Sequence, residues 1–348
     1  MKLPLEPVGT CLADTMLDKF FDSQASSSFR EVYQRITGDQ RITGRLKNCD
    51  RTAMREALDS GSWPSVLSAA VNRQMVVDYR GPGWDAWRRL VTIKRGVTNF
   101  RTQQAVRIGG YGDLQNVAEG DPYPSLESPT EETGSYAVTK RGGTETITLE
   151  MIKNDDIQAI RGVPKRLAQA AQRTVARFAL EFLRTNPVIY DGVALFHATH
   201  GNLGNAALSA SSLHAGRVAL MRQAEPGSGE KLGTQPRCLW VPLDLEESAA
   251  NLFRRGTNQD KTFVQNMPVE VIPVWYWENT NNWCLSADPD LLPSIELAFL
   301  DGNDEPQIIL QGLPTGGSLF SNDQITMKLR HIYGGTVINY RGLYKSIV

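Results

Sequence analysis

Apolar side chains recur at helical spacing in two long segments of the chain. The segment WPSVLSAAVNRQMVVDY has apolar residues at every fourth position from Leu67 to Tyr79, and Pro64 suits its first turn. The second segment has a longer apolar stripe, at Val163, Leu167, Ala171, Val175, Phe178 and Phe182. Pro164 can occupy its first turn, and Asn186 followed by Pro187 ends it. We therefore predict a long helix over about 163–185.

Shorter runs have the alternating or continuous apolar pattern of strands. The alternating positions are Ile147, Leu149 and Met151, and then Ile325, Met327 and Leu329. Four more segments are apolar enough for buried strands, namely RCLWVPL, VEVIPVWYW, NWCLSA and QIILQ. Between them, DLEESAANLFRRG is typical of a short helix with Asp244 as its cap and Glu247 three residues later. Helices and strands mixed in this way predict an α+β fold.

Residues 108–136 break this regularity. Their sequence, IGGYGDLQNVAEGDPYPSLESPTEETGSY, has almost no apolar periodicity and contains five glycines and three prolines. A connection of this length without an apolar core of its own is usually functional or disordered. We predict a projecting β-arm that becomes ordered by lying on another subunit; a mobile surface loop is the alternative.

The two regions differ in charge, although the whole chain carries only −1. Residues 104–160 hold four Lys and Arg against ten acids, a balance of −6, whereas residues 161–187 hold six against one, a balance of +5. An acidic arm and a basic helix are suited to docking between copies, which would set register and orientation. The helix could instead face nucleic acid through sequence-independent phosphate contacts, or both faces could simply be solvated.

The candidate residues follow from this charge pattern. On the arm, the candidates for assembly contacts are Asp113, Glu119, Asp121, Glu127, Glu131 and Glu132. On the long helix, the candidates for contacts with another subunit or with DNA are Arg166, Arg173, Arg177 and Arg184.

Cysteines and hydropathy indicate the compartment. Cys11, Cys49, Cys238 and Cys284 are scattered, which argues against a disulfide scaffold or a zinc cage and favours a reducing cytoplasm. The start MKLPLEPVGTCLADTM lacks the apolar run of a signal peptide, and no segment approaches the ~20 apolar residues that span a bilayer. We expect a protein made in the cytoplasm with no membrane partner.

The segment HATH holds the only pair of neighbouring histidines, His197 and His200. Ala198 and Thr199 stand where a zinc hydrolase would need a base such as Glu, so we interpret the pair as hydrogen-bonded loop histidines in a turn. The chain has no G-x-S-x-G elbow that would place a nucleophile near them.

Two other segments have superficial resemblances to functional motifs. GSGEKLG lacks the spacing of a phosphate-binding loop, and we expect a surface loop there. Asp155 and Asp156 precede the long helix, where negative charge favours the helix N-terminus. We therefore predict no catalytic, cofactor or metal site.

At this point the chain resembles the major capsid proteins of tailed bacteriophages, in the subfamily that includes Mu-like major head subunits and capsid proteins fused to a prohead protease. The similarity runs over roughly residues 60–348. The matching segments, in the family's order, are VLSAAVNRQMVVDYRGPGW, GGYGDLQNVAEGDPYP, ITLEMIKNDDIQAIRGVPKRLAQAAQRTVARF, NPVIYDGVALFHATHGNLG, LHAGRVALMRQ, WVPLDLEESAANLF and MKLRHIYGGTVINYRGLYK. Each is moderately specific, and their common order is the stronger sign. Residues 1–60 match no segment of the family, and we expect no fused protease.

The resemblance implies the Hong Kong 97-type capsid fold. Its expected parts are an N-terminal arm over 1–60, a peripheral domain over 61–103, 143–189 and 321–348 with a spine helix at about 163–185, an extended hairpin arm called the E-loop over 104–142, and an axial domain over 190–320. The E-loop has no Lys before Lys140, so we assign no isopeptide cross-link. Non-covalent contacts or a separate cement protein would then stabilise the shell.

The implied function is that of a major capsid protein, a structural protein rather than an enzyme. Homo-pentamers and homo-hexamers would form an icosahedral shell around double-stranded DNA, with a scaffold, a maturation protease, a portal and decoration proteins as possible partners. The protein would be assembled in the host bacterial cytoplasm and reside in the virion capsid. Two alternatives remain: an encapsulin-like nanocompartment shell, and a metal-dependent hydrolase that uses His197 and His200.

Overall fold

The computed structural model describes residues 34, 63–81, 85–126, 129–148, 150–151, 154, 157–253, 263–311 and 324–348. The expected N-terminal arm, 1–60, lies outside the described residues apart from residue 34. The described chain forms two compact units. The first takes residues from 63–83, 140–174 and 303–332, and the second takes those from 84–139, 175–302 and 333–348.

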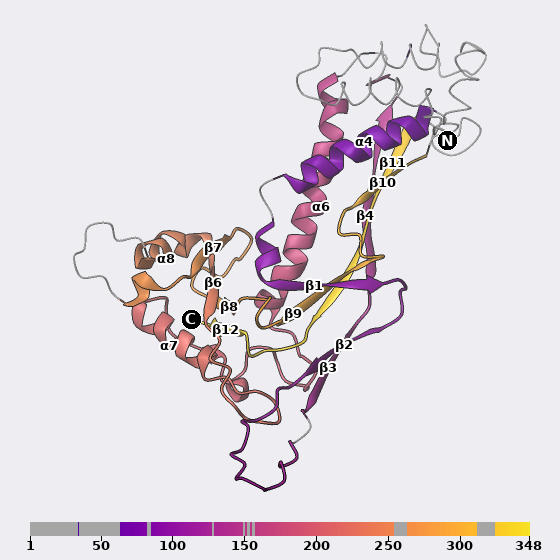
Figure 1. Ribbon diagram of the computed structural model, residues 1–348. Coiled ribbons are helices and arrows are strands. Elements are labelled where there is room, and N and C mark those ends of the chain that lie inside the picture. The colour runs from indigo at the N-terminus through magenta and orange to yellow at the C-terminus, as the bar shows by residue number, and fades with distance from the viewer. Residues whose placement is uncertain are drawn as a thin grey trace, which may run out of the picture. The chain divides into compact units, whose positions relative to one another are not determined.

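The first unit combines helices with part of a sheet (Figure 1). Its elements are α4 (Trp63–Arg80), β4 (Thr139–Thr148), the first part of α6 (Ile157–Thr185), β10 (Gln307–Gln311) and the first part of β11 (Gln324–Val337). β10 pairs with β11 in antiparallel fashion, β4 also pairs with β11, and α4 packs against β10. The predicted apolar face of α4 is confirmed, because Val71, Met75 and Tyr79 are buried.

The long helix α6 is confirmed, but its predicted start is wrong. The helix begins at Ile157, so Pro164 lies inside it rather than in its first turn. A proline within a helix removes one backbone hydrogen bond, and Pro164 is buried there next to the buried Val163. The predicted end is correct, because the helix stops at Thr185 and Asn186 has a φ of 51°. Asp155 and Asp156, the expected N-terminal charges, lie outside the described residues.

The second unit contains the larger sheets. β1 (Val91–Val97) pairs in parallel with β9 (Ile295–Leu300), and β9 pairs in antiparallel fashion with Tyr333–Val337 of β11. A separate five-stranded sheet has the order β5-β12-β8-β6-β7. Its strands are β5 (Leu203–Gly204), β12 (Leu343–Ser346), β8 (Trp283–Ala287), β6 (Pro236–Pro242) and β7 (Glu270–Val274).

Helices and a large apolar core support these sheets. α7 (Ala210–Met221) packs on β12, and α8 (Glu246–Phe253) packs on β6 and β7. Short 3-10 helices lie at Asp85–Arg89, Ala198–His200, Leu243–Leu245 and Phe263–Asn266. The core of the unit joins the C-terminal half of α6 to both sheets through fully buried aromatic residues, including Phe196, Trp240, Phe299 and Tyr333.

Most predicted strands are present, with three local corrections. The strand expected through Met151 ends at Thr148, because residues 150–151 are helical. The strand in VEVIPVWYW ends at Val274, where a turn begins. Asp244 does not cap α8 but lies inside a 3-10 helix that precedes it, and Pro242 occupies the cap position of that helix.

The mixed architecture confirms the predicted α+β class. The two compact units divide the chain at other positions than the expected arm, peripheral and axial domains, whose limits remain a prediction. Within the described residues, none of the helices has the length and apolar character needed to cross a membrane.

Candidate assembly surface

The second unit carries a projecting hairpin, as the sequence predicted (Figure 1). Its strands are β2 (Gln103–Ile108) and β3 (Glu131–Tyr136), paired in antiparallel register from Gln103↔Tyr136 to Ile108↔Glu131. One further hydrogen bond extends the ladder, from the amide of Gly109 to the carbonyl oxygen of Thr130 at 2.9 Å. The described residues between 110 and 130 contain no helix or strand. We call β2, β3 and this connection the arm.

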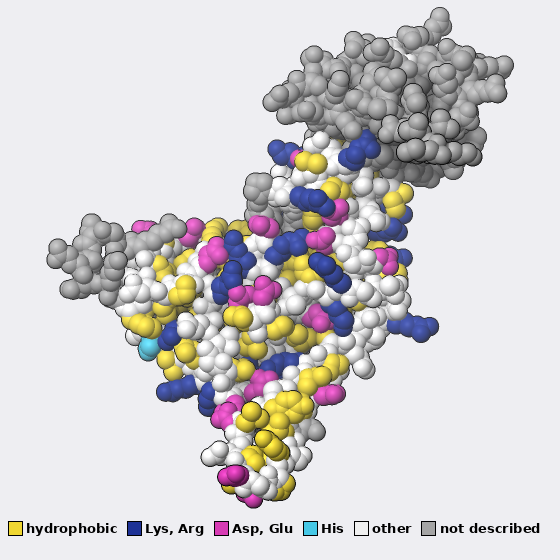
Figure 2. All heavy atoms as spheres, viewed as in Figure 1, with side chains coloured by type: hydrophobic (Ala, Val, Ile, Leu, Met, Phe, Trp, Pro, Cys, Tyr) yellow, Lys and Arg dark blue, Asp and Glu magenta, His cyan; other side chains and the backbone are white. Residues whose placement is uncertain are grey.

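The tip of the arm exposes large apolar side chains. Tyr123 is 88% exposed and Leu114 is 82% exposed, and Tyr111 and Leu126 are also exposed. Figure 2 shows apolar side chains gathered along this projection. Single exposed apolar residues are ordinary, but a contiguous group on a projecting segment is typical of a surface that binds another protein.

The acidic candidates on the arm fall into different environments. Asp113, Glu119 and Asp121 are exposed among the apolar residues of the tip, and Glu131 is exposed at the start of β3. Glu127 lies outside the described residues. Their role between copies remains a prediction. Glu132 differs from them, because it is partly buried and paired with arginines of its own chain.

The ion pairs of Glu132 belong to a cluster at the root of the arm. Arg107 on β2 donates to the two carboxylate oxygens of Glu225 at 2.8 and 2.7 Å, and its guanidinium also lies 3.4 Å from Glu132. Arg341 donates to both carboxylate oxygens of Glu132 at 2.7 and 2.9 Å. These four side chains are between 8 and 13% exposed. Burial, with the negative charge of Glu132, also raises the pKa of the adjacent Tyr190.

This cluster corrects part of the expectation for residues 108–136. The tip is exposed, but Glu132, Gly134 and Tyr136 contact the body of their own chain. Sequence reasoning missed Arg107, Glu225 and Arg341, which lie more than 100 residues apart and form no motif. Nothing in their local spacing could have identified them.

The four candidate arginines of α6 are all exposed. The guanidinium of Arg177 lies 5.1 Å from the ring centre of Tyr276, whose hydroxyl donates to the carbonyl oxygen of Arg177 at 3.2 Å. Arg184 pairs with Glu181 one turn earlier. Arg166 and Arg173 are exposed in the part of α6 that belongs to the first unit. Contacts of this face with a subunit or with DNA remain a prediction.

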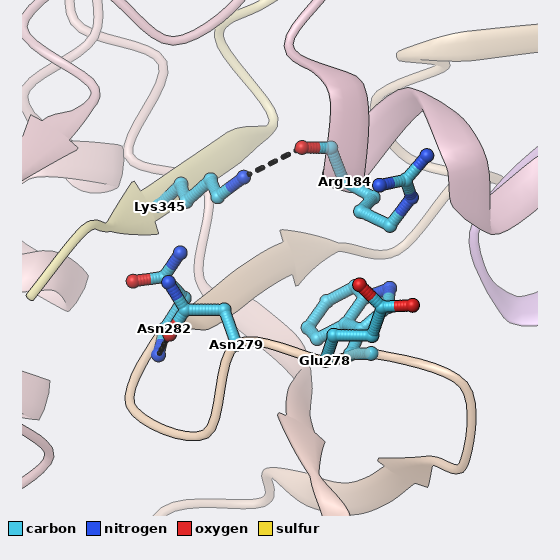
Figure 3. A pocket seen from close by; sticks show the side chains of 6 residues that line it. Arg184, Glu278, Asn279, Asn282 and Lys345 are labelled. Carbon is cyan, nitrogen blue, oxygen red and sulfur yellow. Dashed lines mark hydrogen bonds between the residues drawn. The ribbon is translucent and has the colours of Figure 1, made fainter.

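A hollow of about 440 Å³ lies at the C-terminal end of α6, and Figure 3 shows its lining. The ammonium of Lys345 donates to the carbonyl oxygens of Leu183 and Arg184, at 2.7 and 3.2 Å. Asn282 accepts a hydrogen bond from the amide of Val348, at 3.0 Å. A buried cation at a helix C-terminus neutralises the partial negative charge of its last carbonyls, so these groups stabilise the fold.

The HATH segment forms the hydrogen-bonded turn that the sequence predicted. His197 accepts a hydrogen bond from the amide of Thr199, at 3.2 Å. His200 is buried, with Nδ1 3.0 Å from the carbonyl oxygen of Leu195 and Nε2 2.7 Å from Asp191. Its ring also stacks on Tyr340, with centres 3.9 Å apart. Among the described residues, no group of three or more His, Cys, Asp or Glu side chains is arranged to hold a metal.

Comparison with known proteins assigns the family. Residues 131–346, more than half of the chain, match the model of a family described as phage capsid protein. The capsid of an empty GTA particle shares 10% sequence identity over 77% of this chain and 92% of that chain, with a TM-score of 0.51. The capsid of the native GTA particle shares 10% identity over 77% of this chain and 93% of that chain, with a TM-score of 0.51. The capsid of Myoviridae phage XM1 shares 11% identity over 76% of this chain and 91% of that chain, with a TM-score of 0.47.

These structural matches concern the fold alone, which is the fold of Hong Kong 97-type phage capsid proteins. No curated protein sequence matches the chain. The family match covers β3, the helix α6, β9, β11 and the whole sheet β5-β12-β8-β6-β7, whereas β1 and β2 precede it. The chain belongs to the phage capsid protein family.

Proposed function

We propose that the chain is the major capsid protein of a tailed bacteriophage, of the Mu-like subfamily that its sequence resembles. Copies form pentamers and hexamers, and these close into an icosahedral shell around double-stranded DNA. The family match and the fold support a structural role in a capsid. The protein then resides in the virion and is assembled in the bacterial cytoplasm.

The exposed apolar tip of the arm carries this proposal. Leu114 and Tyr123 are more than four-fifths exposed, although burial of such side chains stabilises a protein by about 1.5–3 kcal/mol each. In the second unit, the arm's own body covers the root and leaves this tip in solvent. A second copy that covers the tip would remove its apolar surface from water.

Many such contacts suffice for a shell even when each is modest. Part of the gain from buried area is lost to the entropy and desolvation costs of association, so one docked tip gives a weak contact. In a closed shell every subunit both gives and receives an arm. The contacts then reinforce one another through the geometry of the shell.

The exposed arginines of α6 suit one of two partners, the packaged DNA or an acidic surface of a neighbouring copy. Phosphate contacts would be independent of sequence and strongly dependent on salt. Scaffold, maturation protease, portal and decoration proteins are further expected partners of the assembled form.

The test is assembly of the double variant Leu114→Ser/Tyr123→Ser. We expect a folded subunit with an unchanged circular dichroism spectrum that no longer forms shells by sedimentation and electron microscopy. Leu291→Ser is the matched control, because Leu291 is 79% exposed but lies outside the arm. Shells of normal yield from the double variant would refute the role of the tip.

The contents of the shells separate this proposal from its alternatives. Double-stranded DNA in particles from infected cells supports the capsid, whereas an enclosed enzyme without DNA would indicate a nanocompartment. A wild-type chain that forms no particles and carries stoichiometric zinc, lost on replacing His197 and His200, would indicate the hydrolase instead.

A further inference from the structure

We propose that the ion cluster Glu225–Arg107–Glu132–Arg341 is an intrachain clasp that sets the direction of the arm before assembly. The inference rests on the proposed function, because it assumes that the arm docks on a second copy. It assigns positioning roles to four charged residues and to the HATH turn. In the free subunit, the root of the arm would be rigid and the apolar side chains of its tip would be exposed to solvent.

The clasp joins three segments that are distant in sequence. Glu225 receives two hydrogen bonds from Arg107 and one from the amide of Gly110, at 2.9 Å, which ties β2 to the loop after α7. Glu132 receives two from Arg341, which ties β3 to the C-terminal segment. Arg341 uses both terminal nitrogens toward the two oxygens of Glu132, and such paired bonds fix orientation as well as distance. Arg107 holds Glu225 through a single nitrogen, and its other terminal nitrogen lies 3.4 Å from Glu132.

Close backbone contacts at glycines reinforce the same attachment. A Cβ at Gly109 would lie 2.5 Å from the carbonyl oxygen of Pro226, and one at Gly134 would lie 3.1 Å from that of Val337. The first distance excludes a side chain at residue 109 and the second makes one at residue 134 tight, so the end of β2 and the middle of β3 lie directly against the body. The arm therefore leaves the body with both strands supported.

The HATH turn supports the C-terminal partner of the clasp. The ring of Tyr340 stacks on His200 at an interplanar angle of 11°, and the guanidinium of Arg341 lies 4.5 Å from the centre of that same ring. His200 is itself held by Asp191, at 2.7 Å. This arrangement gives His200 a structural role: His200 positions Tyr340, and Tyr340 positions Arg341.

A preset arm favours assembly because less freedom is lost when it docks. Restricting a flexible segment on binding costs free energy for each side chain and loop that becomes ordered. The clasp orders the root of the arm when the subunit folds, so this part of the ordering cost does not fall on assembly. Because its charges are almost fully buried within one chain, they serve direction and are not available to the neighbour.

The experiment compares Glu225→Gln with Glu230→Gln in the full-length chain. Glu230 is an exposed carboxylate on the same loop, so the control removes the same charge without touching the clasp. We expect hydrogen exchange of the β2 and β3 amides to rise about tenfold or more in Glu225→Gln, and shell yield to fall by a similar factor. Wild type and Glu230→Gln should behave alike in both measurements.

A covalent lock tests whether direction is the cause. A Cβ at residue 227 would lie 3.6 Å from the Cβ of Thr130, within the range of about 3.5–4.5 Å found across disulfides. Because Gly227 has a φ of 88°, which strains a cysteine, the same oxidised pair in the otherwise wild-type chain is the control for the strain. In a background with Cys11 and Cys49 replaced by serine, oxidised Thr130→Cys/Gly227→Cys should restore shells to Glu225→Gln. The reduced form of the same protein should not.

The outcomes separate this inference from the proposed function. Normal shells from Glu225→Gln, or loss of shells with unchanged exchange at the root, would overturn the clasp and leave the capsid function intact. Failure of the oxidised lock to restore shells to Glu225→Gln, when the same oxidised pair in the otherwise wild-type chain forms them, would also overturn it. If neither wild type nor Glu230→Gln forms shells, the proposed function fails and the clasp loses its purpose with it.

Discussion

Acid should destabilise the first unit through one buried histidine. His331 on β11 is only 5% exposed, and its Nε2 lies 3.1 Å from the carbonyl oxygen of Asp304. Its ring also packs edge-on against Tyr79 of α4, with centres 5.9 Å apart. Burial lowers the pKa of His331 from 6.5 to about 4; the charge of Arg141 lowers it further, and the hydrogen bond to Asp304 opposes the shift.

The sign and size of the effect follow from this shift. A histidine with a lowered folded-state pKa stays neutral in the native protein while the unfolded chain takes up a proton. Stability is therefore complete above about pH 6.5 and is lost as the pH falls towards 4. The full difference of about 2.5 pKa units corresponds to about 3 kcal/mol, of which about 2 kcal/mol should be lost between pH 7 and pH 4.5.

The measurement is equilibrium unfolding in urea of unassembled wild type and of His331→Gln, at several pH values between 4.5 and 7.5. Glutamine can keep the hydrogen bond to Asp304 but cannot titrate, and subtraction removes the shared contribution of the carboxylates. We expect the stability advantage of wild type over the variant to shrink by about 2 kcal/mol as the pH falls to 4.5. A difference that stays constant across this range would refute the reasoning.

Two further predictions concern the fold that supports the arm and the sheets. Lys345→Met should lower the free energy of unfolding by about 2 kcal/mol, because the last carbonyls of α6 lose a charged donor, and urea unfolding against the exposed control Lys231→Met measures it. Gly334→Ala should cost about 1–3 kcal/mol, because its Cβ would lie 2.3 Å from the carbonyl oxygen of Ala137. Gly143→Ala, which meets nothing within 4 Å, should leave the melting temperature unchanged, and equal melting of the two variants would contradict the prediction.

Sequence periodicity predicted those helices and strands whose buried face is set by the spacing of apolar residues within the element itself. The stripe through Val163, Val175 and Phe182 identified α6, and the apolar run RCLWVPL identified β6. The lack of such a pattern over residues 108–136 identified the exposed connection of the arm, but it gave no sign that β3 at its end has Gly134 and Tyr136 buried against the body.

Other features depend on contacts that local patterns do not contain. The start of α6 was misplaced because Pro164 is a start signal only when the preceding residues are not helical. β9 and β12 were missed as separate strands; both are largely buried and pair with segments far away in sequence. The clasp was missed for the same reason, because Arg107 meets Glu225 only once the fold is formed.

The sequence predicted one acidic assembly surface over the whole arm, but the acids at its root and at its tip lie in different environments. At the root, Glu132 is neutralised by arginines of its own chain, so its charge cannot also guide a neighbour. At the tip, Asp113 and Asp121 are exposed beside Leu114 and Tyr123 in sequence. In the proposed shell the acids would guide encounter and the apolar residues would supply the contact. Part of the acidity counted over residues 104–160 therefore serves folding, and the remainder suits orientation more than affinity. In the proposed shell such a surface would hold its partner mainly by apolar burial, which salt does not screen.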